Sequence, residues 1–210
     1  MWAGGADVIS IDSPRMAELM RGESVEEIEQ IRNEVHSNVA RLKQVGYLDL
    51  SPEAATQFSI NALSARFLPQ EITQNRLSFP YADFNLHVDG LEKRGMLAAH
   101  VDVSDVVAPD IFNDIAVVYF HPSKDILVTV QQVDESVSSP KTVLYAEFAN
   151  VTLGDYPGSL VTRKAKDGKV VSTLMWFTDR FRFEVSAGGY TKIDELERLA
   201  MEVGASIAKR

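Results

Sequence analysis

Residues 170–186 read VVSTLMWFTDRFRFEVS and show the strand pattern of the C-terminal half most clearly. The first part, residues 170–177, is an almost unbroken apolar run, with Trp176 near its end. After a turn at Thr178-Asp179, apolar residues alternate with polar ones through residues 181–186. Alternation with period two is typical of an antiparallel strand that turns one face to solvent. The stretch therefore predicts a pair of strands, and it predicts that Trp176 anchors the core.

The same pattern extends upstream of this stretch. Residues 126–131 alternate in the same way, and Asp167-Gly168 is a good two-residue hairpin signal. Further strands are expected at residues 84–88, 96–103, 115–120, 143–153 and 159–163. The strands follow one another too closely for crossover helices, so we expect a mostly antiparallel sheet of about seven to nine strands.

Helical patterns dominate the start of the chain and return at its end. A short helix is expected after Ser13-Pro14, and a third helix after Ser51-Pro52. Between them, Ser24 and Glu27 form a capping box, and Gly46 is a stop signal for the long helix that follows. A last helix carries an apolar stripe that should lie on a sheet face, formed by Leu196, Leu199, Ala200, Val203 and Ile207.

These patterns divide the chain into two unlike parts. Residues 1–67 are expected to form a helical N-terminal segment, and residues 68–210 an antiparallel-sheet α+β domain. The predicted fold class is α+β, with an N-terminal helical segment, a curved, mostly antiparallel sheet and a C-terminal helix packed on one face.

The long helix carries an apolar seam of its own. Its members recur at spacings of three, four and seven residues, and they are Ile28, Ile31, Val35, Leu42 and Val45. Such a seam predicts protein contact, either against the sheet or in a homodimer. Asn38 lies in the same register and would favour one alignment at some cost in stability.

Composition restricts the function. The chain has 30 acidic and 21 basic residues and a net charge of −9, which disfavours binding to nucleic acid or to an anionic membrane surface. It has no cysteine, which excludes disulfides, thiolate catalysis and cysteine-based zinc sites. The longest apolar runs are much shorter than the ~18 residues of a membrane span.

No catalytic motif emerges from the sequence. There is no glycine-rich phosphate loop and no nucleophile elbow. His87 and His100 lie in strands expected to be close together, each with an aspartate two residues later, which makes a metal site conceivable. Alternation alone predicts the same residues as the wet face of a sheet. We therefore expect a protein that is not an enzyme and has no cofactor and no metal. A metal site at His87 and His100 is the one exception that the sequence allows.

A sheet that curves under helices can enclose an apolar ligand. The tentative lining residues are Tyr145, Phe148, Phe181 and Phe183. An ordinary filled core is the alternative, because strand alternation does not distinguish a lined cavity from a packed interior.

Several short motifs recur in the order of a known bacterial family. They are Leu68-Pro69, the strand Leu127–Gln132, the glycine turn within Val151–Val161, the Leu-x-Trp of Leu174–Trp176, the alternating aromatics of Phe181–Ser186 and the helix motif Glu195–Ala200. In these motifs the chain resembles the uncharacterised extracytoplasmic C-terminal domain of bacterial anti-sigma factors. That domain is related in fold to MucB/RseB-type periplasmic regulators and to outer-membrane lipoprotein carriers.

The resemblance implies a function and a location. The chain would be a non-enzymatic binding or sensory domain in the periplasm or at the cell surface, taking part in signal transduction with a protein partner or a hydrophobic ligand. It also implies that a membrane anchor preceded this chain. Two alternatives stay open: a carrier of a lipid or other hydrophobic ligand, and a cytoplasmic enzyme whose site is not visible in sequence.

Overall fold

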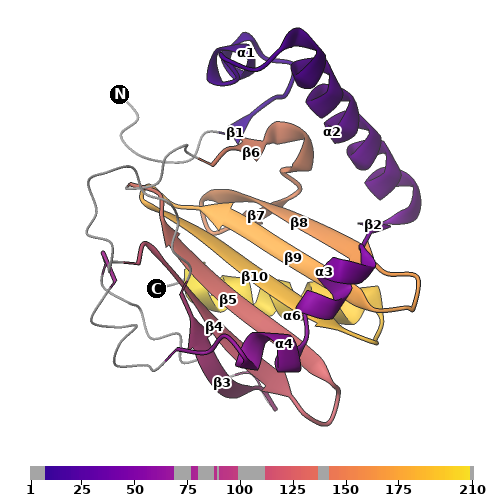
Figure 1. The fold of residues 1–210 in the computed structure, drawn as a ribbon, viewed down its shortest axis with the longest axis vertical. Helices are drawn as coiled ribbons and strands as arrows, with labels where there is room; N and C mark the ends of the chain where they lie inside the picture. The colour runs from indigo at the N-terminus through magenta and orange to yellow at the C-terminus, as the bar shows by residue number, and fades with distance from the viewer. Residues whose placement is uncertain are drawn as a thin grey trace.

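The computed structural model describes residues 8–68, 77–79, 88, 90–98, 112–136 and 142–208. The chain is an α+β protein built on a large, open, mostly antiparallel sheet (Figure 1). Helix α6 (Ile193–Ala208) packs on one face, and the N-terminal helices lie on the other side and at one edge. The predicted fold class is confirmed.

In the described part of the chain this sheet has eight strands. Their order is β2-β8-β9-β10-β5-β4-β3, with β7 paired to the outer side of β8. The strands are β2 (Leu48–Asp49), β3 (Glu92–Leu97), β4 (Asp114–His121), β5 (Ile126–Asp134), β7 (Val151–Leu153), β8 (Tyr156–Lys164), β9 (Val170–Phe177) and β10 (Phe181–Gly189). All pairings are antiparallel except that of β2 with β8, so a strand from the N-terminal segment joins the sheet.

Strands β9 and β10 form the pair that residues 170–186 predict, and the hairpin lies at the centre of the sheet. Phe183 pairs with Trp176, and Val185 pairs with Leu174. These residues face α6, whose Leu196, Ala200, Val203 and Ile207 complete one core. Trp176 is fully buried in it, which confirms its predicted role. Helix and sheet approach closely at Gly204, where a Cβ atom would lie 2.4 Å from the Leu174 Cδ2 atom.

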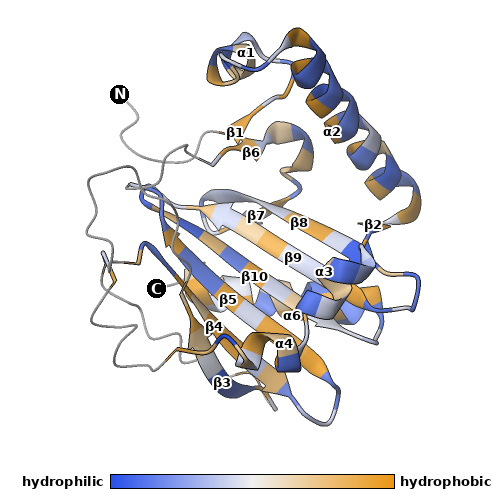
Figure 2. Ribbon diagram, in the orientation of Figure 1, coloured by the Kyte–Doolittle hydropathy of each residue, from blue (hydrophilic) through white to orange (hydrophobic). Residues whose placement is uncertain are grey.

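The opposite face has a discontinuous cover. Helices α3 (Pro52–Gln57) and α4 (Ile60–Ser64) cover one end of it, with smaller apolar clusters beneath them. At the other end, β1 (Val8–Ile9) pairs in parallel with β6 (Leu144–Tyr145), which continues into the 3-10 helix η1 (Ala146–Phe148). Helices α1 (Pro14–Leu19) and α2 (Val25–Val45) pack on this small second layer. Figure 2 shows the alternation of apolar and polar residues along the sheet strands.

Two expected elements differ from the sequence reading. Residues 143–153 do not form one strand but β6, η1 and β7, because the Glu147 side chain is drawn to the N-terminal layer by hydrogen bonds from Ser10 and Ile11. The third helix divides into α3 and α4 at Phe58, where Ser59 caps the second piece. The long helix has the predicted bounds, and both capping-box hydrogen bonds between Ser24 and Glu27 form.

The expected strand at residues 96–103 begins earlier, because β3 spans Glu92–Leu97. Residues 99–103 lie outside the described residues, as do residues 84–87 of the expected strand at 84–88.

Candidate functional site

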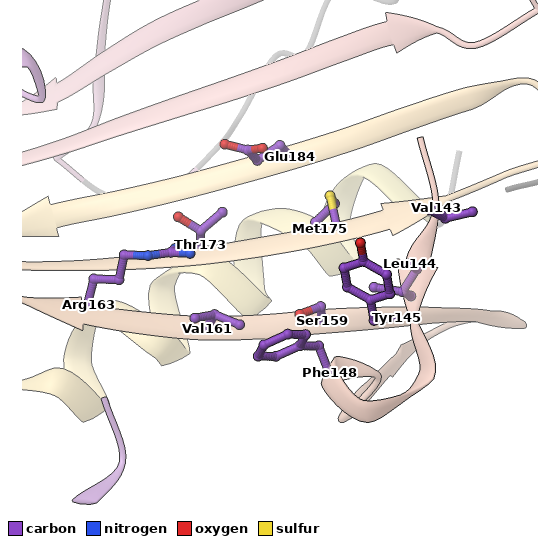
Figure 3. Close-up of a pocket in the computed structure, with 10 residues that line it drawn as sticks. All are labelled: Val143, Leu144, Tyr145, Phe148, Ser159, Val161, Arg163, Thr173, Met175 and Glu184. Atoms are coloured by element: carbon purple, nitrogen blue, oxygen red, sulfur yellow. The ribbon is translucent and has the colours of Figure 1, made fainter. Parts of the chain in front are cut away.

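A cavity of about 340 Å³ lies on the sheet face opposite α6, between the β6–η1 segment and strands β8, β9 and β10 (Figure 3). Its lining residues are Val143, Leu144, Tyr145, Phe148, Ser159, Val161, Arg163, Thr173, Met175 and Glu184. Strands and the second layer therefore contribute opposite walls of one site.

The period-two geometry of the strands selects the lining. Ser159, Val161 and Arg163 alternate along β8 with residues that face α6, and Thr173 and Met175 do the same along β9. Met175 pairs with Ser159 on one side and with Glu184 of β10 on the other. One row across three strands thus forms part of the cavity floor.

The opposite wall is held by a carboxylate. The Ser10 hydroxyl donates to Glu147 at 2.6 Å, and the backbone N–H of Ile11 donates to the same carboxylate at 3.2 Å. Burial raises the pKa of Glu147, but the hydrogen bonds that it accepts outweigh burial and hold that pKa below its usual value. Near neutral pH, an ionised Glu147 therefore fixes η1, and with it Tyr145 and Phe148, over the sheet.

The apolar part of the lining remains accessible. Tyr145, Phe148 and Met175 are half-buried rather than packed away. Burial raises the pKa of the Tyr145 hydroxyl, and the negative charge of Glu147 raises it further. The hydroxyl is therefore protonated near neutral pH and can donate a hydrogen bond into the cavity.

The polar lining residues fall into two groups. Thr173 is hydrogen-bonded to Ser186 at 2.9 Å, and Glu184 accepts from Ser186 and lies 3.8 Å from Arg182. By contrast, the side chains of Ser159, Arg163 and Tyr145 form no hydrogen bond or ion pair with any other described residue. The cavity thus combines an apolar wall with three unused donors.

The structure separates the four aromatic residues expected to line a ligand site. Tyr145 and Phe148 line the cavity. Phe183 stacks on Trp176 on the α6 face, with ring centroids 5.1 Å apart, and Phe181 lies against Phe79 at 5.4 Å. Residues 181 and 183 share their strand face with the buried Val185, and they are half-buried against the core that α6 covers.

Sequence reasoning did not single out Arg163, Ser159, Met175 or Glu184 as site residues. The alternation itself carried a signal for two of them. Met175 and Glu184 each lie next in sequence to a core residue, Trp176 and Val185, so they face the other side of the sheet. For Arg163 and Ser159 the signal was weaker, because their strand is near the edge of the sheet.

The seam of the long helix packs behind the cavity wall. Val35 is buried in the second-layer core, and Ile28 and Ile31 pack against it together with Val143, Tyr145 and Phe148. Towards the C-terminal end of α2, Leu42 is half-buried and Val45 is 45% exposed. The N-terminal part of the seam therefore contacts the β6–η1 layer within the chain, and the homodimer stays a prediction.

The structure does not test the conceivable metal site, because His87 and His100 lie outside the described residues. Among the residues that are described, no group of three or more histidine or acidic side chains could hold a metal ion. In the same part of the chain, no helix is both long and apolar enough for a membrane span.

Comparisons of the chain with protein-family models, curated proteins and solved structures found no match. The resemblance to the anti-sigma-factor domain therefore stays a prediction. What the arrangement can do follows from its own chemistry: an apolar wall beside free donors suits a small amphipathic molecule.

Proposed function

We propose that this chain is a non-enzymatic binding domain that holds a small amphipathic molecule between η1 and the open face of the sheet. One observation carries the proposal: the 340 Å³ cavity combines accessible apolar side chains with three donors that have no partner among the described residues. This volume is at the lower end of the ~300–1,000 Å³ of ligand pockets, so it suits a single small molecule rather than a two-chain lipid.

A sensory role is the favoured form of this proposal. Ile28, Ile31 and Val35 of α2 pack behind Tyr145 and Phe148, so the wall of the cavity is also the packing surface of the long helix. A ligand that shifts this wall would change how α2 packs, and a partner protein could detect that change. An extracytoplasmic location, as in anti-sigma-type regulators, belongs to the proposal on the strength of the sequence resemblance.

The two alternatives differ in what they need from the cavity. A carrier needs the same apolar wall plus a route for release, and the small volume limits it to a single-chain cargo. An enzyme would need an activated nucleophile, and no described side chain is hydrogen-bonded to the Ser159 hydroxyl as a base. Both features support binding over turnover.

Fluorescence titration with the neutral probe N-phenylnaphthylamine tests the proposal. We expect saturable binding at one site, weakened about tenfold in Met175→Trp because the larger side chain fills the cavity. Leu19→Trp is the matched control, since it adds the same ring at an exposed residue of α1. Absence of probe binding to a folded wild-type chain would contradict the proposal, and so would equal affinity of wild type and Met175→Trp.

A further inference from the structure

We infer that the molecule held in this cavity carries an anionic group, and that the Arg163 guanidinium binds it. The inference rests on the proposed function and adds the chemical class of the ligand. It also assigns to Arg163 the choice between anionic, neutral and cationic molecules of the same shape.

The two charged side chains that line the cavity, Glu184 and Arg163, differ in their ion pairs. Arg182 lies 2.8 Å from Glu135 and 3.8 Å from Glu184, so the acidic lining residue already has a positive neighbour. Arg163 has no carboxylate partner in the described part of the chain. Arg163 is exposed on the cavity side of β8, so its guanidinium is accessible to a molecule that enters the cavity.

A second, independent observation indicates a polar ligand. Ser159 is only 5% exposed and lines the cavity, yet its hydroxyl bonds to no other described residue. The hydroxyl is not one of the fully buried polar atoms without a partner, so it opens to the cavity and can bond to a molecule held there. Figure 3 shows the Tyr145 hydroxyl directed over β9 toward Met175, a further free group on the same cavity.

The positions of the lining residues indicate how a ligand would be oriented in the cavity. Arg163 lies four residues along β8 from Ser159, and Figure 3 shows its guanidinium extending back beside Thr173. The apolar side chains Tyr145, Phe148 and Met175 lie toward the Ser159 end. An anionic head at Arg163 would therefore place the apolar body of the ligand against η1. Arginine is suited to this role, because its planar fork donates two parallel hydrogen bonds to a carboxylate.

Calorimetry with three probes of one chain length tests the inference: decanoate, decanol and decylammonium, each below the concentration at which it self-associates. We expect wild type to bind decanoate about tenfold more tightly than decanol, as a charge-assisted hydrogen bond predicts. Arg163→Gln should remove this preference and leave the affinity for decanol unchanged. Arg163→Glu should favour decylammonium instead.

Lys164→Gln is the matched control. It removes the same charge from the next residue of β8, but Lys164 turns to the other face of the sheet, where its Nζ lies 5.5 Å from the Tyr47 ring centroid. We expect it to bind decanoate as wild type does. If wild type binds decanoate and decanol equally, or if Arg163→Gln still prefers decanoate, the inference about Arg163 is wrong. That result would not contradict the proposed binding function. If a folded wild-type chain binds none of the probes and no N-phenylnaphthylamine, both proposals fail.

Discussion

The two faces of the sheet are covered in different ways. On one face, the single 16-residue helix α6 lies across the sheet and closes one core with Leu174, Trp176 and Val185. On the other, separate pieces from residues 8–67 and 142–148 cover the two ends. The continuous helix packs its buried residues directly on the sheet, whereas on the other face the cavity lies where pieces from distant parts of the chain meet.

Because of this difference, neighbouring residues of one strand serve different purposes: those facing α6 stabilise the fold, and those facing the cavity are available for binding. Thr173 and Met175 are half-buried on the cavity face, while Leu174 and Trp176 between and beside them are fully buried on the other. Substitutions one residue apart on the same strand should therefore have different consequences for stability and for binding.

The largest effect is expected from Trp176→Ala. Removing this fully buried ring should lower the free energy of unfolding by about 3–5 kcal/mol, because the transfer energy and the cavity left behind add. Met175→Ala is its neighbour and control, with a loss of about 1 kcal/mol expected for a half-buried side chain. Urea denaturation measures both, and equal losses would show that the two faces do not differ as described.

The second effect concerns the buried charge on the α6 side. The Asp134 side chain is fully buried and accepts hydrogen bonds from Arg180 at 2.5 and 3.1 Å and from Ser136. Burial raises the pKa of Asp134, but the hydrogen bonds from Arg180 and Ser136 outweigh it and hold the pKa below 3.8. The pair therefore contributes stability above pH 3.8 that is lost as the pH falls through the folded-state pKa.

Arg180→Ala removes the Arg180 cation from the Asp134 carboxylate. We expect a loss of about 2–4 kcal/mol at neutral pH, tempered by the exposure of Arg180 and by the remaining donors of Ser136. The stability difference from wild type should shrink as the pH falls below 3.8, since a protonated Asp134 no longer needs the cation. Chemical denaturation across this range measures the difference, and a difference independent of pH would rule out the pair as its source.

The strands of the sheet were the most predictable part of the fold. The β9–β10 hairpin follows from local alternation, since period two fixes which residues share a face. The 3-10 helix η1 was not predictable, because the Glu147 carboxylate reaches Ser10, 137 residues away in sequence. A tertiary hydrogen bond of this kind overrides local strand propensity, and no window of sequence contains both partners.

The cavity shows the same limit. Tyr145 and Phe148 were expected to contact a ligand and do line the cavity. Phe181 and Phe183 carry the same aromatic signal, but they face α6. Alternation states which residues share a face, yet it does not state which face the long helix or η1 will cover. Which face each helix covers depends on contacts between segments that are remote in sequence. The same holds for the absence of a described ion-pair partner at Arg163.

A smaller effect is expected at Lys169, whose ammonium group anchors helix α3 to the sheet face that carries the cavity. The buried Lys169 Nζ donates to the carbonyls of Ala55 and Phe58, at the C-terminal end of α3, at 2.6 and 2.5 Å. Lys169→Met should cost about 1–2 kcal/mol, because these carbonyls lose their donor while the aliphatic packing remains. Hydrogen exchange should show α3 and α4 opening more readily while α6 stays protected. If α6 opens to the same extent, the two covers are coupled rather than separate.

The smallest effect is expected at Glu184, whose neighbour Val185 belongs to the buried core. Glu184 is half-buried on the cavity side, and its contacts with Ser186 at 3.3 Å and Arg182 at 3.8 Å are weak. Glu184→Gln should therefore change the free energy of unfolding by no more than about 0.5 kcal/mol. The same substitution removes a negative charge from the lining, so decanoate should bind about two- to threefold more tightly, with the gain fading at high salt. Calorimetry and urea denaturation of one protein preparation measure both quantities. A large loss of stability, or weaker decanoate binding, would mean that this face is structural like the other.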